Sequence, residues 1–457
     1  MRLSPLLYLL ALCITSFPST AAEYIFTNVH VISMSSDESA NAADSAQTLR
    51  DQAVIIAGDR IQAIVPMTDF DAATDIMTES TPSKPVIIDG QGRYLLPGLA
   101  EMHGHVPPLE DARYPSRYLD DTLLLYLAGG ITTVRGMLGH ADQLQLKEDI
   151  ENGARLGPNL YMAGPSFNGN SVDSVEQVRN MVTQHHAAGW DLLKVHPGLQ
   201  LAEFEAMAER ANQLGIDFAG HIPEQVPLDV AMALGIRTID HMDGYIEFVG
   251  ATDRAIEDAE INTLVNLTLQ HEVGVVPTQA LWATLIGAAD HDQLKQYDEV
   301  KYMPPEVREG WQDHLERVPR SGYYSGEHAA LHQHNRQRLL AAMQAAGVEI
   351  LMGTDAPQVY SVPGLGLVRE LAMMEDAGMS PYEVLYSGTV AVGDYFAEYD
   401  NFGQVREGYR ADLILVDENP LTQLATLGRP AGVMVRGQWL DRDTLDEKLT
   451  EIETAYQ

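Results

Sequence analysis

The stretch Val86–His105, "VIIDGQGRYLLPGLAEMHGH", joins a turn signal, an apolar run and two histidines in one short segment. Asp89-Gly90 is typical of a β-turn between strands. In a β-strand, residues two positions apart face the same side, so His103 and His105 are expected to point the same way. Gly104 leaves room beside them. The pair would supply half of a metal site, although His-x-His also arises by chance.

The chain before and after this stretch has the pattern of short alternating strands. Residues 23–95 contain "EYIFTNVHVISM" and "QAVIIAGDRIQAIV", and the C-terminal part contains "ADLILVD" (411–417) and "GVMVRGQWLD" (432–441). Gly58-Asp59 is another turn signal of the kind that separates strands. We therefore predict a small composite β-sandwich domain built from both chain ends, residues 23–95 and 399–457.

Residues 96–398 alternate short apolar strands with amphipathic stretches such as "LAEFEAMAERANQLG". This alternation predicts an α/β fold, a (β/α)8 TIM barrel. A long polar segment with several tyrosines, residues 290–344, is inserted before the last strand. It is compatible with a lid and equally with a surface helical hairpin. The eight candidate strands are "GLAEMHGHV", "GITTVRGM", "NLYMAGP", "DLLKVHP", "DFAGHIP", "RTIDHMD", "GVVPTQAL" and "EILMGTDAP".

Residues 1–22 resemble a secretory signal peptide, with a basic Arg2, an apolar run and small residues before Glu23. The alternative, a membrane anchor, is disfavoured because the apolar run is shorter than the ~20 residues that a span needs. The only cysteine, Cys13, lies inside this segment, which excludes disulfides and cysteine ligands from the mature chain. We expect an exported protein, periplasmic or secreted, without stable membrane association after cleavage.

The chain is strongly acidic, with 29 Lys and Arg against 65 Asp and Glu and a formal net charge of −36. Such a surface repels phosphate backbones and anionic lipids, which argues against nucleic-acid and membrane-surface partners. A small-molecule substrate is the expected partner, and homo-oligomerisation is left open. Hydrophobic residues make up 45% of the chain, enough for a large core.

Ligand-capable residues recur at the ends of four other candidate strands, namely Lys194, His221, His241 and Asp355. Barrel enzymes gather their catalytic groups at this C-terminal rim. Each residue alone would be read as an ordinary surface or structural group, but their joint occurrence is hard to assign to chance. The same His-x-His spacing in "LHQHN", His332 and His334, falls in a helical pattern, where the two side chains diverge and are expected to be solvated.

With these residues in place, the sequence resembles the amidohydrolase superfamily of metal-dependent hydrolases. The resemblance extends from "VIIDGQGRYLLPGLAEMHGH" through "YLAGGITTVRG" and "MGTDAP" to "VREGYRADLILVD". One departure is Glu101, where many members have Asp; little consequence is expected, because neither residue is a ligand there.

The resemblance implies a centre of two divalent metal ions. His103, His105 and Asp355 would bind the first, His221 and His241 the second, and an N6-carboxylated Lys194 would bridge them. This donor set suits Zn²⁺, the expected metal, without excluding Mn²⁺, Co²⁺ or Fe²⁺. The implied reaction is amide hydrolysis by a metal-bridging hydroxide, with Asp355 as the catalytic acid and base.

Lys194 favours the branch of prolidase-like dipeptidases and carboxypeptidases. Imidazolonepropionase-like members, which the chain also resembles, typically use one metal and need no lysine there. The expected substrate is a dipeptide or an N-acyl amino acid. Two alternatives stay open: hydrolysis of a cyclic amide, lactone or amidine at the same centre, and a catalytically silent binding protein on the same scaffold.

Two further residues at the rim, His140 and Tyr245, are candidates for binding a substrate carbonyl or carboxylate. Arg135 has two interpretations, neutralising a substrate carboxylate or serving a structural role, and the structural one is more common at a strand end. Four other histidines have no supporting pattern and are interpreted as structural or exposed: His185, His186, His196 and His271.

Overall fold

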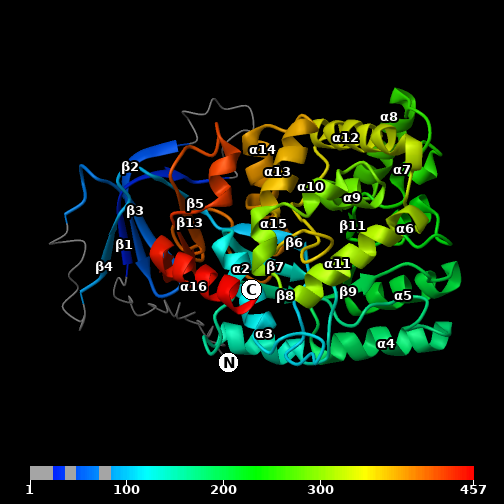
Figure 1. Cartoon of the computed structure of the whole chain (residues 1–457), viewed down its shortest axis with the longest axis horizontal. Coiled ribbons are helices and arrows are strands. Elements are labelled where there is room, and N and C mark those ends of the chain that lie inside the picture. The colour runs from blue at the N-terminus through cyan, green and yellow to red at the C-terminus, as the bar shows by residue number, and fades with distance from the viewer. Residues whose placement is uncertain (1–23, 36–47, 72–83) are drawn as a thin grey trace, which may run out of the picture.

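The computed structural model describes residues 24–35, 48–71 and 84–457, so the predicted signal peptide lies outside the described residues. A sheet lies at one end of the molecule, and a body of strands surrounded by helices lies at the other (Figure 1). In the described part of the chain, no helix is both long and apolar enough to cross a membrane.

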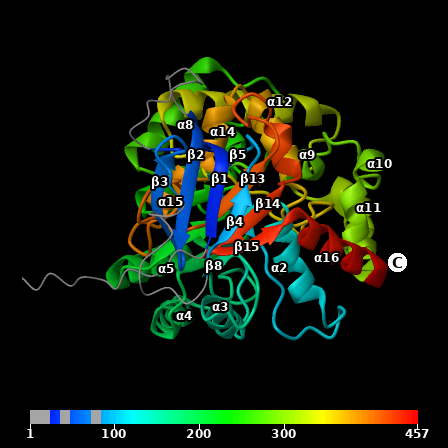
Figure 2. The same cartoon turned by 90° about the vertical axis from the view of Figure 1, so that its left-hand side faces the viewer.

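The sheet at that end combines strands from the two ends of the chain (Figure 2). Its order is β15-β14-β13-β5-β1-β2-β3, with β4 paired to β1. The junction between the two halves is the antiparallel pair β13–β5, in which Ile414 lies opposite Leu96. The residues that are predicted to form a β-sandwich thus form one eight-stranded sheet in the structure. Its strands are β1 (Tyr24–Ile32), β2 (Thr48–Ala57), β3 (Arg60–Pro66), β4 (Val86–Asp89), β5 (Tyr94–Pro97), β13 (Leu413–Val416), β14 (Gly432–Val435) and β15 (Gln438–Asp441).

The middle of the chain contains two parallel sheets, β6-β7-β8 and β9-β10-β11-β12. Isolated parallel bridges link them, Ala163 to Leu192 and Phe167 to Val195. The strands are β6 (Leu99–Gly104), β7 (Ile131–Gly136), β8 (Asn159–Met162), β9 (Leu192–Val195), β10 (Asp217–Gly220), β11 (Thr238–Asp240) and β12 (Gly274–Val276).

The segment 350–355 lies between the outer strands of these two sheets. The Leu351 amide donates to the Val275 carbonyl at 2.9 Å, and the Met102 amide donates to the Met352 carbonyl at 2.9 Å. Seven strands and this segment therefore follow one another in the order that the predicted barrel requires. The strands β6 to β12 pair in two separate sheets and do not form one continuous closed barrel.

Helices connect and cover these strands because their sequences are amphipathic. In α5, Phe204 and Met207 face the core, a capping box of Gln200 and Glu203 starts the helix, and Gly215 ends it at a φ of 69°. The helices outside the insert are α2 (Tyr118–Ala128), α3 (Gln143–Glu151), α4 (Val175–Ala188), α5 (Leu201–Leu214), α6 (Leu228–Ala233), α7 (Tyr245–Phe248), α8 (Asp258–Gln270), α9 (Gln279–Leu285), α13 (Leu367–Asp376), α14 (Pro381–Ser387), α15 (Val390–Tyr395), η5 (Leu424–Gly428) and α16 (Arg442–Ala455).

The insert 290–344 is helical, as its pattern predicts. Its last helix corrects one expectation: His334 is exposed, but His332 is buried and bonded to Ser325 at 2.8 Å. The two side chains do diverge, but one of them packs inside. The insert contains α10 (His291–Leu294), η2 (Asp298–Tyr302), α11 (Pro305–Arg317), η3 (Val318–Arg320), η4 (Gly326–His328) and most of α12 (Ala329–Ala346).

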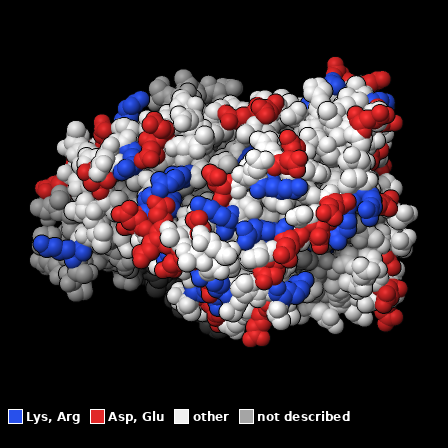
Figure 3. Space-filling view, viewed as in Figure 1, with Lys and Arg blue, Asp and Glu red and all other residues white. Residues whose placement is uncertain are grey.

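The surface carries the acidic excess in a mixed pattern. On the face shown in Figure 3, Lys and Arg side chains lie among Asp and Glu side chains. Ion pairs such as Arg429–Asp446 and Lys301–Glu453 contribute to this mixture.

Candidate metal centre

The strand ends bring the six predicted ligands to one rim of the molecule. His103 lies in β6 and Lys194 in β9, while the other four follow a strand or lie in the segment 350–355. Those four are His105, His221, His241 and Asp355.

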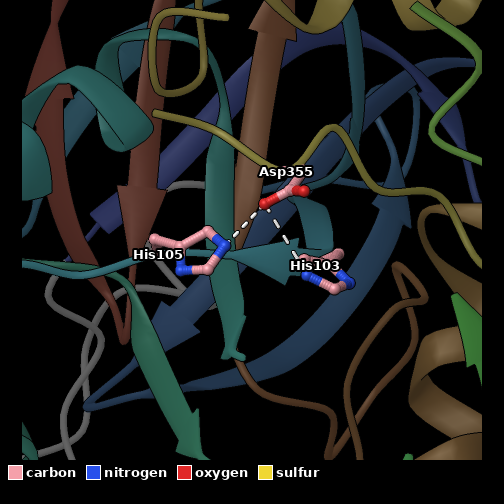
Figure 4. Close-up of side chains that lie close together, drawn as sticks. All are labelled: His103, His105 and Asp355. Carbon is pink, nitrogen blue, oxygen red and sulfur yellow. Dashed lines mark hydrogen bonds and ion pairs between the residues drawn. The ribbon is translucent and has the colours of Figure 1, made fainter. Parts of the chain in front are cut away.

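The tightest group is His103, His105 and Asp355, whose ligand atoms all lie within 4.8 Å of one another (Figure 4). Asp355 Oδ1 is 2.5 Å from His105 Nε2 and 3.6 Å from His103 Nε2. Gly104 between the histidines has no room for a side chain, because a Cβ there would lie 2.8 Å from Glu101 Cγ. These three residues form a candidate site for one metal ion.

The other three predicted ligands adjoin this group. The ring of His241 lies 4.4 Å from that of His103 and 4.6 Å from that of His221, centroid to centroid. His241 Nε2 is 3.8 Å from Asp355 Oδ2. Lys194 Nζ lies 3.2 Å from His103 Nε2. Lys194 thus contacts the first group, and His241 lies between that group and His221.

Hydrogen bonds hold the imidazoles by their Nδ1 atoms. His103 Nδ1 donates to Asp240 at 2.7 Å, and His221 Nδ1 donates to Asp243 at 3.0 Å. His241 Nδ1 bonds the Thr278 hydroxyl at 2.8 Å. The two carboxylates can only accept, so they fix the tautomer of His103 and His221 that leaves Nε2 free for a metal.

The state of these imidazoles also fits a metal site. Burial lowers the pKa values of His103 and His241 well below the usual range, so both rings are neutral, the form that binds a metal. His241 Nε2 is buried and has no hydrogen-bond partner among the described residues. A buried polar atom without a partner is costly, and a bound cation would satisfy it.

A buried ion pair supports the same cluster from behind. Arg135 and Asp240 are fully buried, with Nη2 3.0 Å from Oδ1. Burial alone would raise the pKa of Asp240, but the charges of Arg135 and Lys194 lower it, so Asp240 stays ionised. Arg135 therefore has a structural role, because it pairs with Asp240, the carboxylate that orients His103.

Lys194 is fully buried between this pair and the imidazoles. Burial lowers the pKa of its amine to about 8, against the opposing effect of Asp240. Roughly a tenth of the amine is therefore neutral at pH 7, and this fraction increases as the pH rises.

Glu101 is not a member of the ligand group but is more important than its sequence position suggested. Its buried carboxylate accepts the amide hydrogens of His103 at 3.0 Å and Thr354 at 2.8 Å, and also the Thr354 hydroxyl. Glu101 thus ties β6 to the segment that carries Asp355.

The rim candidates lie in different surroundings. Tyr245 is fully buried and its hydroxyl bonds Thr268 at 2.9 Å, so in this structure it is part of the core and offers a substrate no free donor. His140 is half-buried, and its amide donates to Gln143.

His196, for which the sequence shows no supporting pattern, stacks its ring on that of His221 with centroids 5.2 Å apart. Its Nδ1 is buried without a partner among the described residues. The signal that could have found it is its position two residues after Lys194, at the same strand end.

The strand-end cluster on this α/β body matches a known family. Residues 94–440 match the family model described as "Amidohydrolase family", and the chain belongs to this family. It is therefore a hydrolase acting on carbon–nitrogen bonds, and its relatives agree with this class.

Ochratoxinase of Aspergillus niger is 24% identical over 427 residues, which cover 85% of this chain and 82% of the relative. The structure of bottromycin amidohydrolase superposes with a TM-score of 0.70 at 23% identity, covering 94% of this chain and 90% of that one. A Xaa-Pro dipeptidase with bound methionine has a TM-score of 0.65 at 19% identity, covering 92% and 99%. These structures share the fold.

Proposed function

We propose that this protein is an exported binuclear amidohydrolase that cleaves an amide bond in a small dipeptide or N-acyl amino acid. The observation that carries the proposal is the convergence of six ligand-capable side chains from the ends of four strands and from the segment 350–355, with the Nδ1 atoms of three imidazoles already bonded. This arrangement prepares nitrogen and oxygen donors for cations.

In the proposed centre, His103, His105 and Asp355 hold one ion, and His221 and His241 hold the other. Lys194, if carboxylated by carbon dioxide, would supply oxygen ligands to both ions, and burial lowers the pKa of its amine toward the neutral form that reacts with carbon dioxide. The donor set of imidazoles and carboxylates suits zinc. When bound, the metals supply a hydroxide near neutral pH and polarise the scissile carbonyl.

Asp355 moves the proton. Its carboxylate lies against His105 on one side and within 3.8 Å of His241 on the other, at the meeting point of the two groups. From there it takes the proton released as the nucleophile attacks and delivers it to the leaving amine. Glu101 holds the backbone beside it through Thr354.

The size and type of substrate are supported by the relatives. One of the solved structures with this fold is a Xaa-Pro dipeptidase with bound methionine, a single amino acid. We carry a small amino-acid or dipeptide ligand of this kind to the present chain.

The test is a substrate panel on the metal-replete mature protein. We expect dipeptides or N-acyl amino acids to be hydrolysed at millimolar concentration or below, with two metal ions per chain by elemental analysis. Rapid turnover of lactones or cyclic amides with inert dipeptides would replace the proposed substrate class. No turnover and no metal uptake would favour a binding protein.

Export is tested separately, by expressing the full chain with its own N-terminus in a Gram-negative host. We expect the protein in the periplasmic or secreted fraction with Glu23 as its first residue by mass spectrometry. Intact protein in the cytoplasm, with Met1 or Arg2 retained, would rule out cleavage at this site.

A further inference from the structure

The helix α9 contacts His241 twice. Its N-cap residue Thr278 bonds His241 Nδ1, and Trp282, four residues later, stacks on the imidazole with ring centroids 5.2 Å apart and planes inclined by 12°. Residues four apart lie on one face of a helix. One turn of α9 therefore contacts His241 both at Nδ1, on the edge of the ring, and on the face of the ring.

The backbone at this contact is in a conformation that side-chain-bearing residues rarely adopt. His241, Met242 and Thr278 have φ values of 66°, 51° and 41°. Strained residues persist where surrounding packing holds them, and they concentrate at functional sites. Strain on both partners of the His241–Thr278 bond indicates that this geometry is specifically maintained.

The insert 290–344 packs against the other sides of Trp282. Arg336 of α12 places its guanidinium carbon 5.1 Å from the indole centre, and the Tyr323 ring lies 4.9 Å from it. Trp282 itself is 2% exposed. The indole is therefore enclosed between the insert and the imidazole of His241.

Arg336 is unusual because it is a buried cation without an ion pair in the described part of the chain. Its hydrogen bonds go to the Gln279 side chain at 3.3 Å and the Pro277 carbonyl at 3.1 Å, both at the start of α9. A buried charge requires compensation, and the indole face provides part of it as a cation–π partner. Arg336 thus joins α12 to the turn that holds His241.

We propose that Trp282 is a positioning residue of the metal centre: with Arg336 and Tyr323 of the insert behind it, it fixes the His241 imidazole so that Nε2 faces the second metal. This inference rests on the proposed binuclear centre. Under this inference the insert 290–344 helps to retain the metal, a role that differs from that of a lid over the substrate.

The experiment compares zinc release from the loaded full-length mature enzyme to an excess of chelator. Trp282→Leu is expected to lose one of its two zinc ions about 10–100-fold faster than wild type, the usual size of effect when a ligand loses its support. Trp282→Phe keeps a ring that can stack on His241, so its rate of zinc release should lie between those of wild type and Trp282→Leu. Trp311→Leu is the matched control, because Trp311 is a buried indole within the insert whose ring partner is Tyr360 and not His241.

A second readout separates positioning from general destabilisation. Co²⁺ added to metal-free wild type should quench part of the tryptophan emission, and Trp282→Phe should lose that part while Trp311→Phe keeps it. Thermal unfolding of the metal-free proteins, measured in parallel, would shift for both Leu variants. A purely structural role predicts that the two Leu variants also match in zinc release.

The inference is overturned if Trp282→Leu releases zinc at the wild-type rate, or if Trp282→Phe does so where the Leu variant fails to fold. It is also overturned if the Co²⁺ quenching persists in Trp282→Phe. If these outcomes occur while the wild-type enzyme binds two metal ions and hydrolyses its substrate, the role of Trp282 is rejected and the proposed function is kept. If the wild-type enzyme takes up no metal, both the role of Trp282 and the proposed function are rejected.

Discussion

Asp355→Asn is expected to lower kcat by about 10³-fold or more, within the range that general acid–base groups contribute. The substitution keeps the shape of the side chain but removes the charge that lies 2.5 Å from His105 Nε2. An amide cannot accept and return the proton, and it is a weaker ligand than a carboxylate. Steady-state kinetics on protein with measured metal content checks the prediction.

The matched control is Asp243→Asn, because Asp243 bonds His221 Nδ1 without belonging to the proposed ligand set. Loss of this support is expected to weaken metal binding by about 10–100-fold, and excess zinc should restore most of the activity. Excess zinc should not restore Asp355→Asn. An Asp355→Asn enzyme within tenfold of the wild-type kcat would contradict the role given to Asp355.

Lys194→Ala is expected to lose the bridge between the metals and to lower kcat/KM by about 10³-fold, since metal-centred charge stabilisation contributes several kcal/mol. Lys194 is fully buried, so alanine leaves a cavity next to His103. Acetate or propionate should enter that cavity, replace the missing carboxylate, and restore part of the activity in a concentration-dependent way.

Lys147→Ala serves as the control, because Lys147 is a partly exposed lysine paired with Asp191. It should keep its activity and show no response to added acids. Full activity of Lys194→Ala with one metal per chain would contradict the two-metal centre.

The ligand-capable residues can be found in the sequence because they lie at or just after the ends of apolar strands, and parallel strands place such positions on one rim. Strand periodicity and the distance between successive units single out His103, Lys194 and His241 as candidates, whereas their roles as metal ligands are implied by the resemblance to the amidohydrolase superfamily. The pairing of both chain ends can be predicted from the short strand segments that flank the long middle of the chain, and in the sheet Ile414 lies opposite Leu96, one residue beyond the predicted boundary at residue 95.

Other features depend on packing between distant segments, which no local pattern encodes. The hydroxyl of Tyr245 is used by Thr268, and the pairing of the two residues is visible only once α7 and α8 are packed. The burial of His332 and the contact between Trp282 and Arg336 depend on how the insert folds back. His196 lacked a motif of its own, so only its place beside His221 distinguishes it.

The pairing of β5 with β13 also determines when the sheet can be completed during synthesis of the chain. β5 leads directly into β6 and His103, yet one of its two neighbours in the sheet is made from residues 413–416, far later in the chain. The sheet therefore cannot be completed on a partly emerged chain, and its apolar edge at Leu95 and Leu96 stays open until the last strands arrive. A chain cut short before residue 413 would retain all six ligand-capable side chains and still present an unpaired strand edge to its neighbours.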